Sequence, residues 1–229
     1  MEKKKIKEWF STQNNIIVHN YKKKIFLSSS GLTQRIWQQE IIHKINDTKV
    51  KNVLEIGSGN GINQRIFSEK FSKINFTGID NSVEGIKSSN ELKNSILEKC
   101  MFYPLDINCE NINKKNSTFV YADAQNLPFN DKSFDFIFTI LALEQMNHII
   151  KNVLTEIKRC AAKHIFLIKP FKDLNMSCLK YLHHRASQYL SLNSIDFTDD
   201  NFKLINFKKD YPNKLSLGVG LLHLERVVN

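Results

Sequence analysis

A short apolar run that leads directly into a glycine-rich turn constrains the fold of this chain more than any other feature. Residues 53–56 read Val-Leu-Glu-Ile, and residues 57–61 read Gly-Ser-Gly-Asn-Gly. The apolar residues are typical of a strand buried on both faces of a parallel sheet, and residues 60–67 are typical of the start of a helix. Glycines let a backbone approach a ligand closely, and open α/β sheets bind ligands at the carboxyl ends of their strands. The pattern therefore predicts a nucleoside-binding site at this turn.

The spacing of the glycines distinguishes between the cofactors that such a turn can bind. A dinucleotide fingerprint reads G-x-G-x-x-G, whereas the sixth residue from Gly57 is Ile62, so a pyrophosphate site is disfavoured. With Glu55 the order becomes Glu-x-Gly-x-Gly-x-Gly, which resembles motif I of the class I S-adenosylmethionine-dependent methyltransferases. The resemblance implies that the turn lies beside the aminoacyl part of S-adenosylmethionine and that the acid helps to orient it. For the turn taken alone, a plain strand-to-helix connection is the alternative.

A second predicted strand, residues 73–80, ends in an acidic residue. Asp80 follows the turn by about 20 residues, which is the usual separation of a ribose-binding carboxylate. This arrangement resembles motif II of the same family, which implies that Asp80 accepts hydrogen bonds from the ribose and that Asn81 contacts the adenine edge or the ribose. Alternatively, Asp80, Asn81 or Ser82 caps a helix that begins near Val83. The two roles are compatible, because a capping loop lies where the ligand would bind.

Two later segments follow in the order that the family has. From Asp123 the chain reads Asp-Ala-Gln-Asn-Leu-Pro-Phe, which resembles the D-A-x-x-L-P-F segment of small-molecule methyltransferases of the ubiquinone/menaquinone-biosynthesis type. The resemblance implies that Asp123 accepts a hydrogen bond from the adenine amino group and that the backbone of Ala124 reaches a ring nitrogen. Residues 133–140 resemble the strand of motif IV, which ends at Ile140 and leads into the active-site loop.

The resemblance implies a Rossmann-like α/β fold with a seven-stranded, mostly parallel sheet, helices on both faces and an antiparallel C-terminal strand pair. Residues 163–171 read as the fifth strand, residues 174–192 as a helix, and residues 202–207 and 220–228 as the closing pair. These segments place the resemblance over most of the chain after residue 50.

The chain is expected to divide into an N-terminal helical cap or lid, residues 1–46, and a methyltransferase domain, residues 47–229. Residues 2–12 and 31–46 predict the two helices of the cap, and the polar linker over residues 19–31 has the composition of a mobile lid. Asp80 and Asp123 are 43 residues apart, whereas a strand–helix–strand unit needs about 25 to 30. An insertion is therefore predicted at residues 98–117.

The segment after the fourth strand carries the candidate catalytic residues. Residues 144–148 resemble the E-x-x-E-H arrangement of quinone-biosynthesis O-methyltransferases, with Glu144 and His148 matching and Asn147 in place of the second acid. That departure argues against a metal role, and no metal is predicted. A histidine titrates near neutral pH and can accept a proton from a substrate hydroxyl, although a surface histidine at a helix end is an equal alternative. Methyl transfer depends mainly on alignment, so a catalytic base is not required.

Composition restricts the partners and the compartment. The net charge of +10 permits a nucleic-acid partner, but the lysines are spread along the chain, which favours a general compositional bias. No secretory signal, membrane span or paired-cysteine motif is present, so a cytoplasmic location and reduced cysteines are expected.

The sequence therefore predicts an enzyme that transfers a methyl group from S-adenosylmethionine to an O, N or C atom of a small molecule, with S-adenosylhomocysteine as product. Methylation of RNA or protein and a non-catalytic binding role are the alternatives. The oligomeric state is left open. The predicted cofactor-binding residues are Glu55, Gly57, Ser58, Gly59, Asn60, Gly61, Asp80, Asn81, Asp123, Ala124 and Ile140, and the catalytic candidates are Glu144 and His148.

Overall fold

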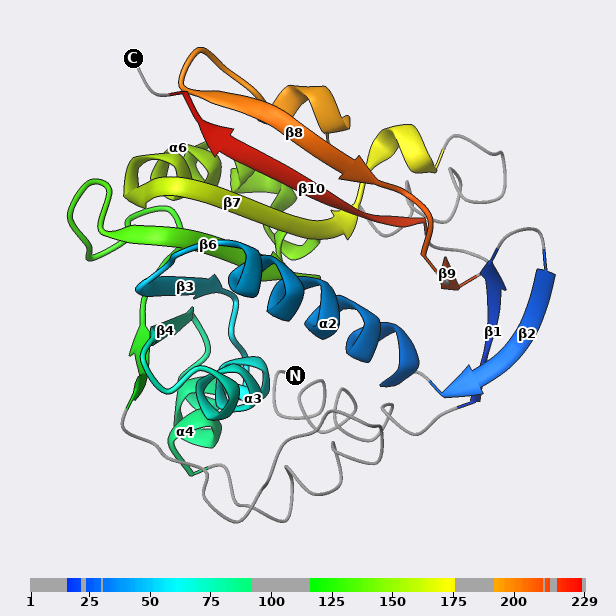
Figure 1. The fold of residues 1–229 in the computed structure, drawn as a ribbon, viewed down its shortest axis with the longest axis horizontal. Helices are drawn as coiled ribbons and strands as arrows, with labels where there is room; N and C mark the ends of the chain where they lie inside the picture. The colour runs from blue at the N-terminus through cyan, green and yellow to red at the C-terminus, as the bar shows by residue number, and fades with distance from the viewer. Residues whose placement is uncertain are drawn as a thin grey trace.

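A seven-stranded sheet forms the centre of the molecule (Figure 1). The computed structural model describes residues 16–21, 24–29, 31–91, 116–175, 192–211, 213–214 and 218–227. The strand order is β5-β4-β3-β6-β7-β10-β8. The strands are β3 (Asn52–Ile56), β4 (Asn75–Asp80), β5 (Ser117–Tyr121), β6 (Phe134–Ile140), β7 (Ala161–Pro170), β8 (Phe202–Lys208) and β10 (Val219–Arg226).

The pairing of these strands confirms the predicted sheet. Strands β5, β4, β3, β6 and β7 are parallel, whereas β10 is antiparallel to both β7 and β8. The chain proceeds from β3 to β4 and β5 on one side, and then crosses to β6 on the other side of β3. Such a reversal leaves a crevice between the carboxyl ends of the two strands, where open sheets bind ligands. The glycine turn leaves β3 at this point.

Helices cover both faces of the sheet (Figure 1), and each face has its own apolar core. The helices are α2 (Gly31–Asp47), α3 (Ile62–Lys70), α4 (Val83–Glu91) and α6 (Ile150–Cys160), with 3-10 helices η4 (Leu143–Ile149), η5 (Lys172–Leu174) and η6 (Ser194–Phe197). Side chains of β6 alternate, so that Phe136 and Phe138 pack with α2 and α3 while Ile137 packs with α6. This period of two is expected of a central strand with both faces buried.

The segment before α2 differs from the expectation. Where a polar linker was predicted over residues 19–31, strands β1 (Ile16–Tyr21) and β2 (Lys24–Ser29) form an antiparallel hairpin, and β9 (Asn213–Lys214) pairs with β1. Each strand has three consecutive apolar residues of high β propensity, residues 16–18 in β1 and residues 25–27 in β2, and Val18 pairs with Leu27. In Figure 1 this small sheet lies toward the end of the molecule to which β6 and β7 point.

The structure gives the bounds of several helices and strands that the sequence placed only approximately. The helix predicted at residues 31–46 is α2, and its Trp37 is buried in the core. The helix after the glycine turn begins at Ile62, and Ser117 belongs to β5 rather than to an insertion. Residues 2–12, 98–115 and 176–191 lie outside the described residues, so the helical cap, the insertion and the domain boundary stay predictions. Among the residues that the structure describes, no helix is long and apolar enough to cross a membrane.

Candidate active site

The glycine turn has a backbone that only glycine adopts easily. Gly57, Gly59 and Gly61 have φ angles of 73°, 53° and 74°, all in the left-handed region. A Cβ atom on Gly57 would overlap Ala142, and one on Gly61 would overlap the Phe119 ring, so these two positions are fixed by packing. A Cβ on Gly59 would meet nothing within 4 Å. The turn therefore presents its middle glycine to open space, as the site of a closely approaching ligand requires.

Asp80 connects this turn to the end of the neighbouring strand. Its Oδ2 accepts a hydrogen bond from the Gly59 N–H at 2.8 Å, and its Oδ1 accepts one from the Ser82 N–H at 2.9 Å. A carboxylate has about four lone-pair positions, so both oxygens can still accept from a ligand hydroxyl. The capping role goes to Ser82, whose Oγ accepts from the Gly85 N–H at 3.0 Å.

Glu55, two residues before the first glycine of the turn, has a buried side chain. Its side chain is only 1% exposed, and its Oε1 accepts a hydrogen bond from Asn63 Nδ2 at 2.7 Å. Asn63 Oδ1 accepts in turn from Gln38 Nε2 at 2.8 Å, which connects α2 to α3. Burial raises the pKa of Glu55 to about 8, with Asp80 raising it further and the Asn63 hydrogen bond opposing the shift. Glu55 is thus a buried group, protonated near neutral pH, that links β3 to α3 through Asn63.

Two polar atoms of the turn are buried without a hydrogen-bond partner. These are Ser58 Oγ and Asn60 Nδ2. An unsatisfied buried polar group costs about 1–3 kcal/mol, and natural proteins keep few of them. Both residues were predicted to contact the cofactor. Ser58 Oγ lies against Gly78 of β4, so the amide of Asn60 is the group left for a bound ligand to partner.

The adenine-binding candidates lie at the ends of the next two strands. Asp123 is exposed, and its Oδ1 accepts from the Gln125 N–H at 2.9 Å, while Ala124 is buried. The Ala122 N–H donates to the Asp80 carbonyl at 3.1 Å, so this loop is held against the end of β4. Asn81 is exposed.

Sequence reasoning overlooked two exposed apolar side chains at the same edge. Val83 is 63% exposed at the start of α4, and Tyr121 is 61% exposed at the end of β5. Their positions, three residues after Asp80 and two residues before Asp123, are the signal that could have identified them, since a flat base needs apolar contacts as well as hydrogen bonds.

The loop after β6 packs against the glycine turn. Ile140 ends β6 and is buried, and the Leu141 N–H donates to the Ile168 carbonyl at 2.8 Å. Leu141 has a φ of 51°, which for a bulky residue costs about 1–3 kcal/mol and is found mostly at functional sites. Its neighbour Ala142 is the residue that a side chain on Gly57 would overlap. This strained loop therefore forms one wall of the site, and nothing in its sequence indicates the strain.

The two catalytic candidates have different environments on η4. Glu144 is 9% exposed, and burial raises its pKa to about 7, whereas the positive charge of Lys169 lowers it. Glu144 Oε2 has no hydrogen-bond partner. His148 is exposed on the same 3-10 helix. The buried carboxyl is therefore poised between its two protonation states near neutral pH, which suits a proton acceptor.

Sequence reasoning did not single out the buried lysine Lys169 at the end of β7. Its side chain is fully buried, and its Nζ has no hydrogen-bond partner. Burial lowers its pKa to about 8, while the charge of Glu144 raises it. A lysine within the apolar run of residues 165–171 was the available signal, because lysine is almost never fully buried unless it is paired.

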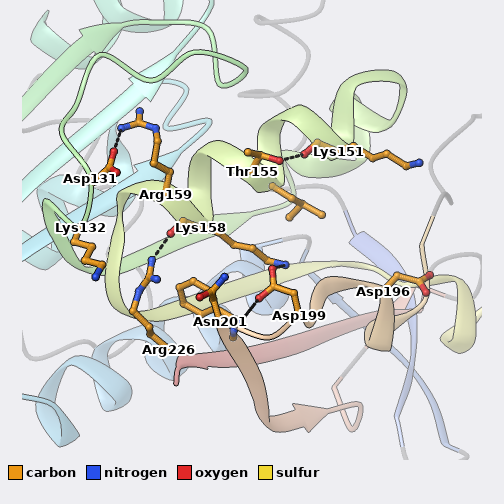
Figure 2. A pocket seen from close by; sticks show the side chains of 12 residues that line it. Asp131, Lys132, Lys151, Thr155, Lys158, Arg159, Asp196, Asp199, Asn201 and Arg226 are labelled. Carbon is orange, nitrogen blue, oxygen red and sulfur yellow. Dashed lines mark hydrogen bonds and ion pairs between the residues drawn. The ribbon is translucent and has the colours of Figure 1, made fainter. Parts of the chain in front are cut away.

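A separate cleft of about 460 Å³ lies at the opposite edge of the sheet (Figure 2). It is lined by residues that precede β6 and β7 and that end β10, so it faces the amino ends of the parallel strands. Lys158 pairs with Asp199 at 2.6 Å, and Arg159 pairs with Asp131 at 2.8 Å. This cleft is remote from the glycine turn and takes no part in the candidate site.

The strand order, the glycine turn and the carboxylates at the ends of β4 and β5 define a Rossmann-like methyltransferase fold. A family model described as "Methyltransferase domain" matches residues 54–168, half of the chain. The chain therefore belongs to this family, and it is a class I S-adenosylmethionine-dependent methyltransferase, as the sequence predicted. The open space at Gly59, the free lone pairs of Asp80 and the unpaired amide of Asn60 fit S-adenosylmethionine as the cofactor.

One curated relative is a demethylmenaquinone methyltransferase from Thermotoga maritima, which is 28% identical over 101 residues. The match covers 44% of this chain and 35% of the relative, so the chain spans about a third of that protein's length in the alignment.

Solved structures share the fold at low sequence identity. A methyltransferase from Methanosarcina mazei has a TM-score of 0.59 and 19% identity, over 82% of this chain and 98% of that one. The [4+2]-cyclase SpnF has a TM-score of 0.70 and 12% identity, over 99% and 93%. The plantazolicin methyltransferase BpumL, in complex with a substrate analogue and S-adenosylhomocysteine, has a TM-score of 0.59 and 14% identity, over 100% and 92%. At these identities the similarity concerns the fold alone.

Proposed function

We propose that this protein transfers a methyl group from S-adenosylmethionine to an oxygen, nitrogen or carbon atom of a small-molecule acceptor. The observation that carries the proposal is the packing of Ala142 against Gly57, because it joins the loop with Glu144 to the turn of the cofactor site. The demethylmenaquinone methyltransferase and plantazolicin methyltransferase relatives support a small acceptor by analogy.

The cofactor is proposed to lie across the carboxyl ends of β3, β4 and β5. Asp80 would accept hydrogen bonds from the ribose hydroxyls, and the backbone at Gly59 would lie beside the aminoacyl group. Asp123 and Ala124 would contact the adenine edge, with Val83 as an apolar contact to its face. The exposure of Val83 supports this arrangement, since it leaves an apolar surface next to the ribose-binding carboxylate.

S-adenosylmethionine, when bound, supplies a methyl group that is activated by a positively charged sulfur. The chain's part is to align the acceptor with that methyl group and to exclude water. The acceptor's lone pair forms the new bond to the methyl carbon, and the carbon–sulfur bond breaks with its electron pair staying on sulfur. For a hydroxyl or amine acceptor, the proton passes to the carboxylate of Glu144, whose pKa of about 7 suits this role. The exposed His148 is proposed to relay that proton to solvent.

The fold also serves other chemistry, as the similarity to a [4+2]-cyclase illustrates, so the test measures methyl transfer directly. The protein is incubated with methyl-labelled S-adenosylmethionine and a metabolite extract of its source cell, and labelled products are separated by size. We expect label in small molecules with wild-type protein and none with Asp80→Ala. Label confined to RNA or protein would replace the small-molecule proposal with the macromolecular one. Binding of S-adenosylmethionine without any methyl transfer would contradict an enzymatic role.

A further inference from the structure

We propose that the buried amine of Lys169 binds an anionic oxygen of the acceptor, such as a phenolate or enolate oxygen, and thereby selects oxygen-acid acceptors. The inference rests on the proposed function, because it assigns the acceptor half of the same site. It concerns a residue that neither the motifs nor the cofactor geometry requires.

The first observation is a pair of buried, unsatisfied polar groups. Lys169 is 0% exposed and Glu144 is 9% exposed, and neither Lys169 Nζ nor Glu144 Oε2 has a hydrogen-bond partner. The two charges are close enough for each to shift the titration of the other. Buried charges are normally paired and hydrogen-bonded, because desolvation is costly. Two buried groups of opposite charge that influence each other and that each have an atom without a hydrogen-bond partner indicate that a polar ligand completes the arrangement.

The second observation is the position of the amine relative to the cofactor turn. Lys169 is the penultimate residue of β7, and β7 is the parallel neighbour of β6. The loop that leaves β6 contains Ala142, at the glycine turn, and Glu144 two residues later. Lys169 and Glu144 therefore lie at the carboxyl edge of the sheet, on the side of β3 where β6 and β7 lie. Apart from Ile140 at the end of β6, the cofactor candidates follow β3, β4 and β5 or belong to them, so the acceptor has the β6 and β7 half available.

The surroundings of the amine indicate the chemistry of its partner. The Nζ lies 5.3 Å from the centroid of the Phe197 ring and 5.9 Å from that of Phe171, and both rings are fully buried. In a low-dielectric site, a ring face attracts a cation much less strongly than an anion does. An anionic oxygen satisfies the amine, and a flat, apolar molecule that carries it matches these apolar surroundings. The cation stabilises the deprotonated, nucleophilic form of the acceptor, while Glu144 takes up its proton.

This assignment has a consequence that a structural role would not have. Burying the Lys169 amine costs desolvation free energy, and Glu144, with a pKa of about 7, can take up a proton when that amine is removed, so an unbranched apolar side chain of similar length should stabilise the protein. We expect Lys169→Met to raise the melting temperature by about 2–4 °C. Lys163→Met is the matched control, because Lys163 is an exposed lysine at the other end of β7.

The test uses calorimetry on the protein saturated with S-adenosylhomocysteine. The probes are phenol, 4-cyanophenol and 4-nitrophenol, which differ in acidity, and 4-nitroanisole, which cannot ionise. We expect the affinity of wild type and Lys163→Met to rise about tenfold or more from phenol to 4-nitrophenol, and Lys169→Met to lose this rise. 4-Nitroanisole should bind all three proteins equally weakly.

Two outcomes overturn the role of Lys169. One outcome is that the affinity of Lys169→Met for the phenols still rises with their acidity as it does in wild type. The other is that wild type binds S-adenosylhomocysteine but none of the phenols. Failure of wild type to bind S-adenosylhomocysteine would instead overturn the proposed function itself. The binding of the cofactor product thus separates the two failures.

Discussion

The carboxylate of Asp80 accepts a hydrogen bond from the backbone N–H of Gly59 at 2.8 Å. One carboxylate oxygen thereby holds the glycine turn of β3 against the end of β4, and the Ile79 carbonyl adds bonds from the N–H groups of Gly57 and Ser58 at 2.9 and 2.8 Å. The residue predicted to bind the ribose is therefore also the residue that shapes the turn. Asp80 therefore connects motif I, the glycine turn, to motif II, the end of β4, through one side chain.

Alanine at the first and second glycines of the turn should have different effects. Gly57→Ala combines a left-handed φ of 73° with overlap onto Ala142, and we expect it to destabilise the protein by about 2–4 kcal/mol. Gly59→Ala has a left-handed φ but no overlap, so a loss of about 1 kcal/mol is expected, with weaker cofactor binding. Urea denaturation and calorimetry measure the two effects. Equal stability losses in both variants would contradict this account of the turn.

The protonated state of Glu55 predicts a stability change with pH. Its pKa is about 8 in the folded protein against 4.5 as its ordinary value, so the unfolded chain releases this proton first as pH rises. The contribution of Glu55 to stability is therefore present below about pH 4.5 and is lost as the pH rises through 8. Glu55→Gln mimics the protonated form, and we expect it to be more stable than wild type at pH 8 and similar at pH 5. Unfolding midpoints that fall equally with pH in both proteins would be evidence against a buried, neutral Glu55.

A buried histidine pair predicts sensitivity in the acid range. His223 Nε2 lies 3.2 Å from His164 Nδ1, and burial lowers the pKa of both residues, that of His223 to about 3. The unfolded chain binds protons more readily, so this contribution to stability is present above pH 6.5 and is lost as the pH falls below it. The positive charge of Lys44 lowers the pKa of both histidines further, whereas the negative charge of Glu225 raises the pKa of His164. His223→Phe keeps the stacking on Phe166 and should flatten the loss between pH 6.5 and 4.5.

How far the sequence determined the fold depends on whether the relevant signal is local. The strand, turn and helix around Gly57 and the acid at Asp80 were predicted because each needs only its own neighbours. The β1–β2 hairpin was missed although its strands are neighbours in the sequence, because Lys22 and Lys23 between them give no turn signal. The pairing of β1 with β9 is not local, since it joins residues almost 200 positions apart, such as His19 and Lys214. Lys169 and the left-handed Leu141 were missed for a related reason. Burial of an amine and strain in a loop depend on tertiary packing, which a pattern of residue types does not record.

A salt-bridged arginine holds the loop that follows Asp123. Arg159 donates to the carbonyls of Leu127 and Phe129 at 3.0 and 2.8 Å and pairs with Glu156 at 2.8 Å. Glu156 accepts from the Leu127 N–H at 2.8 Å, so the loop is bonded from both sides. Arg159→Met removes the donors, and we expect a loss of about 1–3 kcal/mol in unfolding free energy.

Arg159 lies away from the glycine turn, so its removal should leave the affinity for S-adenosylmethionine within about threefold of wild type at temperatures where the variant is folded. Chemical denaturation and calorimetry test both parts. Full stability of Arg159→Met would mean that the loop is held by other contacts.

We expect the turn at Gly59 and the carboxylate of Asp80 to bind S-adenosylmethionine. Calorimetric titration of wild type, Asp80→Ala and Asp135→Ala tests it most directly. Asp135 is the matched control, because its carboxylate also accepts two backbone N–H groups, from Lys51 and Asn52 at 2.8 and 3.0 Å, at the other end of β3. We expect Asp80→Ala to lose about a hundredfold or more in affinity and Asp135→Ala to bind like wild type. Equal binding of S-adenosylmethionine by wild type and Asp80→Ala would contradict the site assignment.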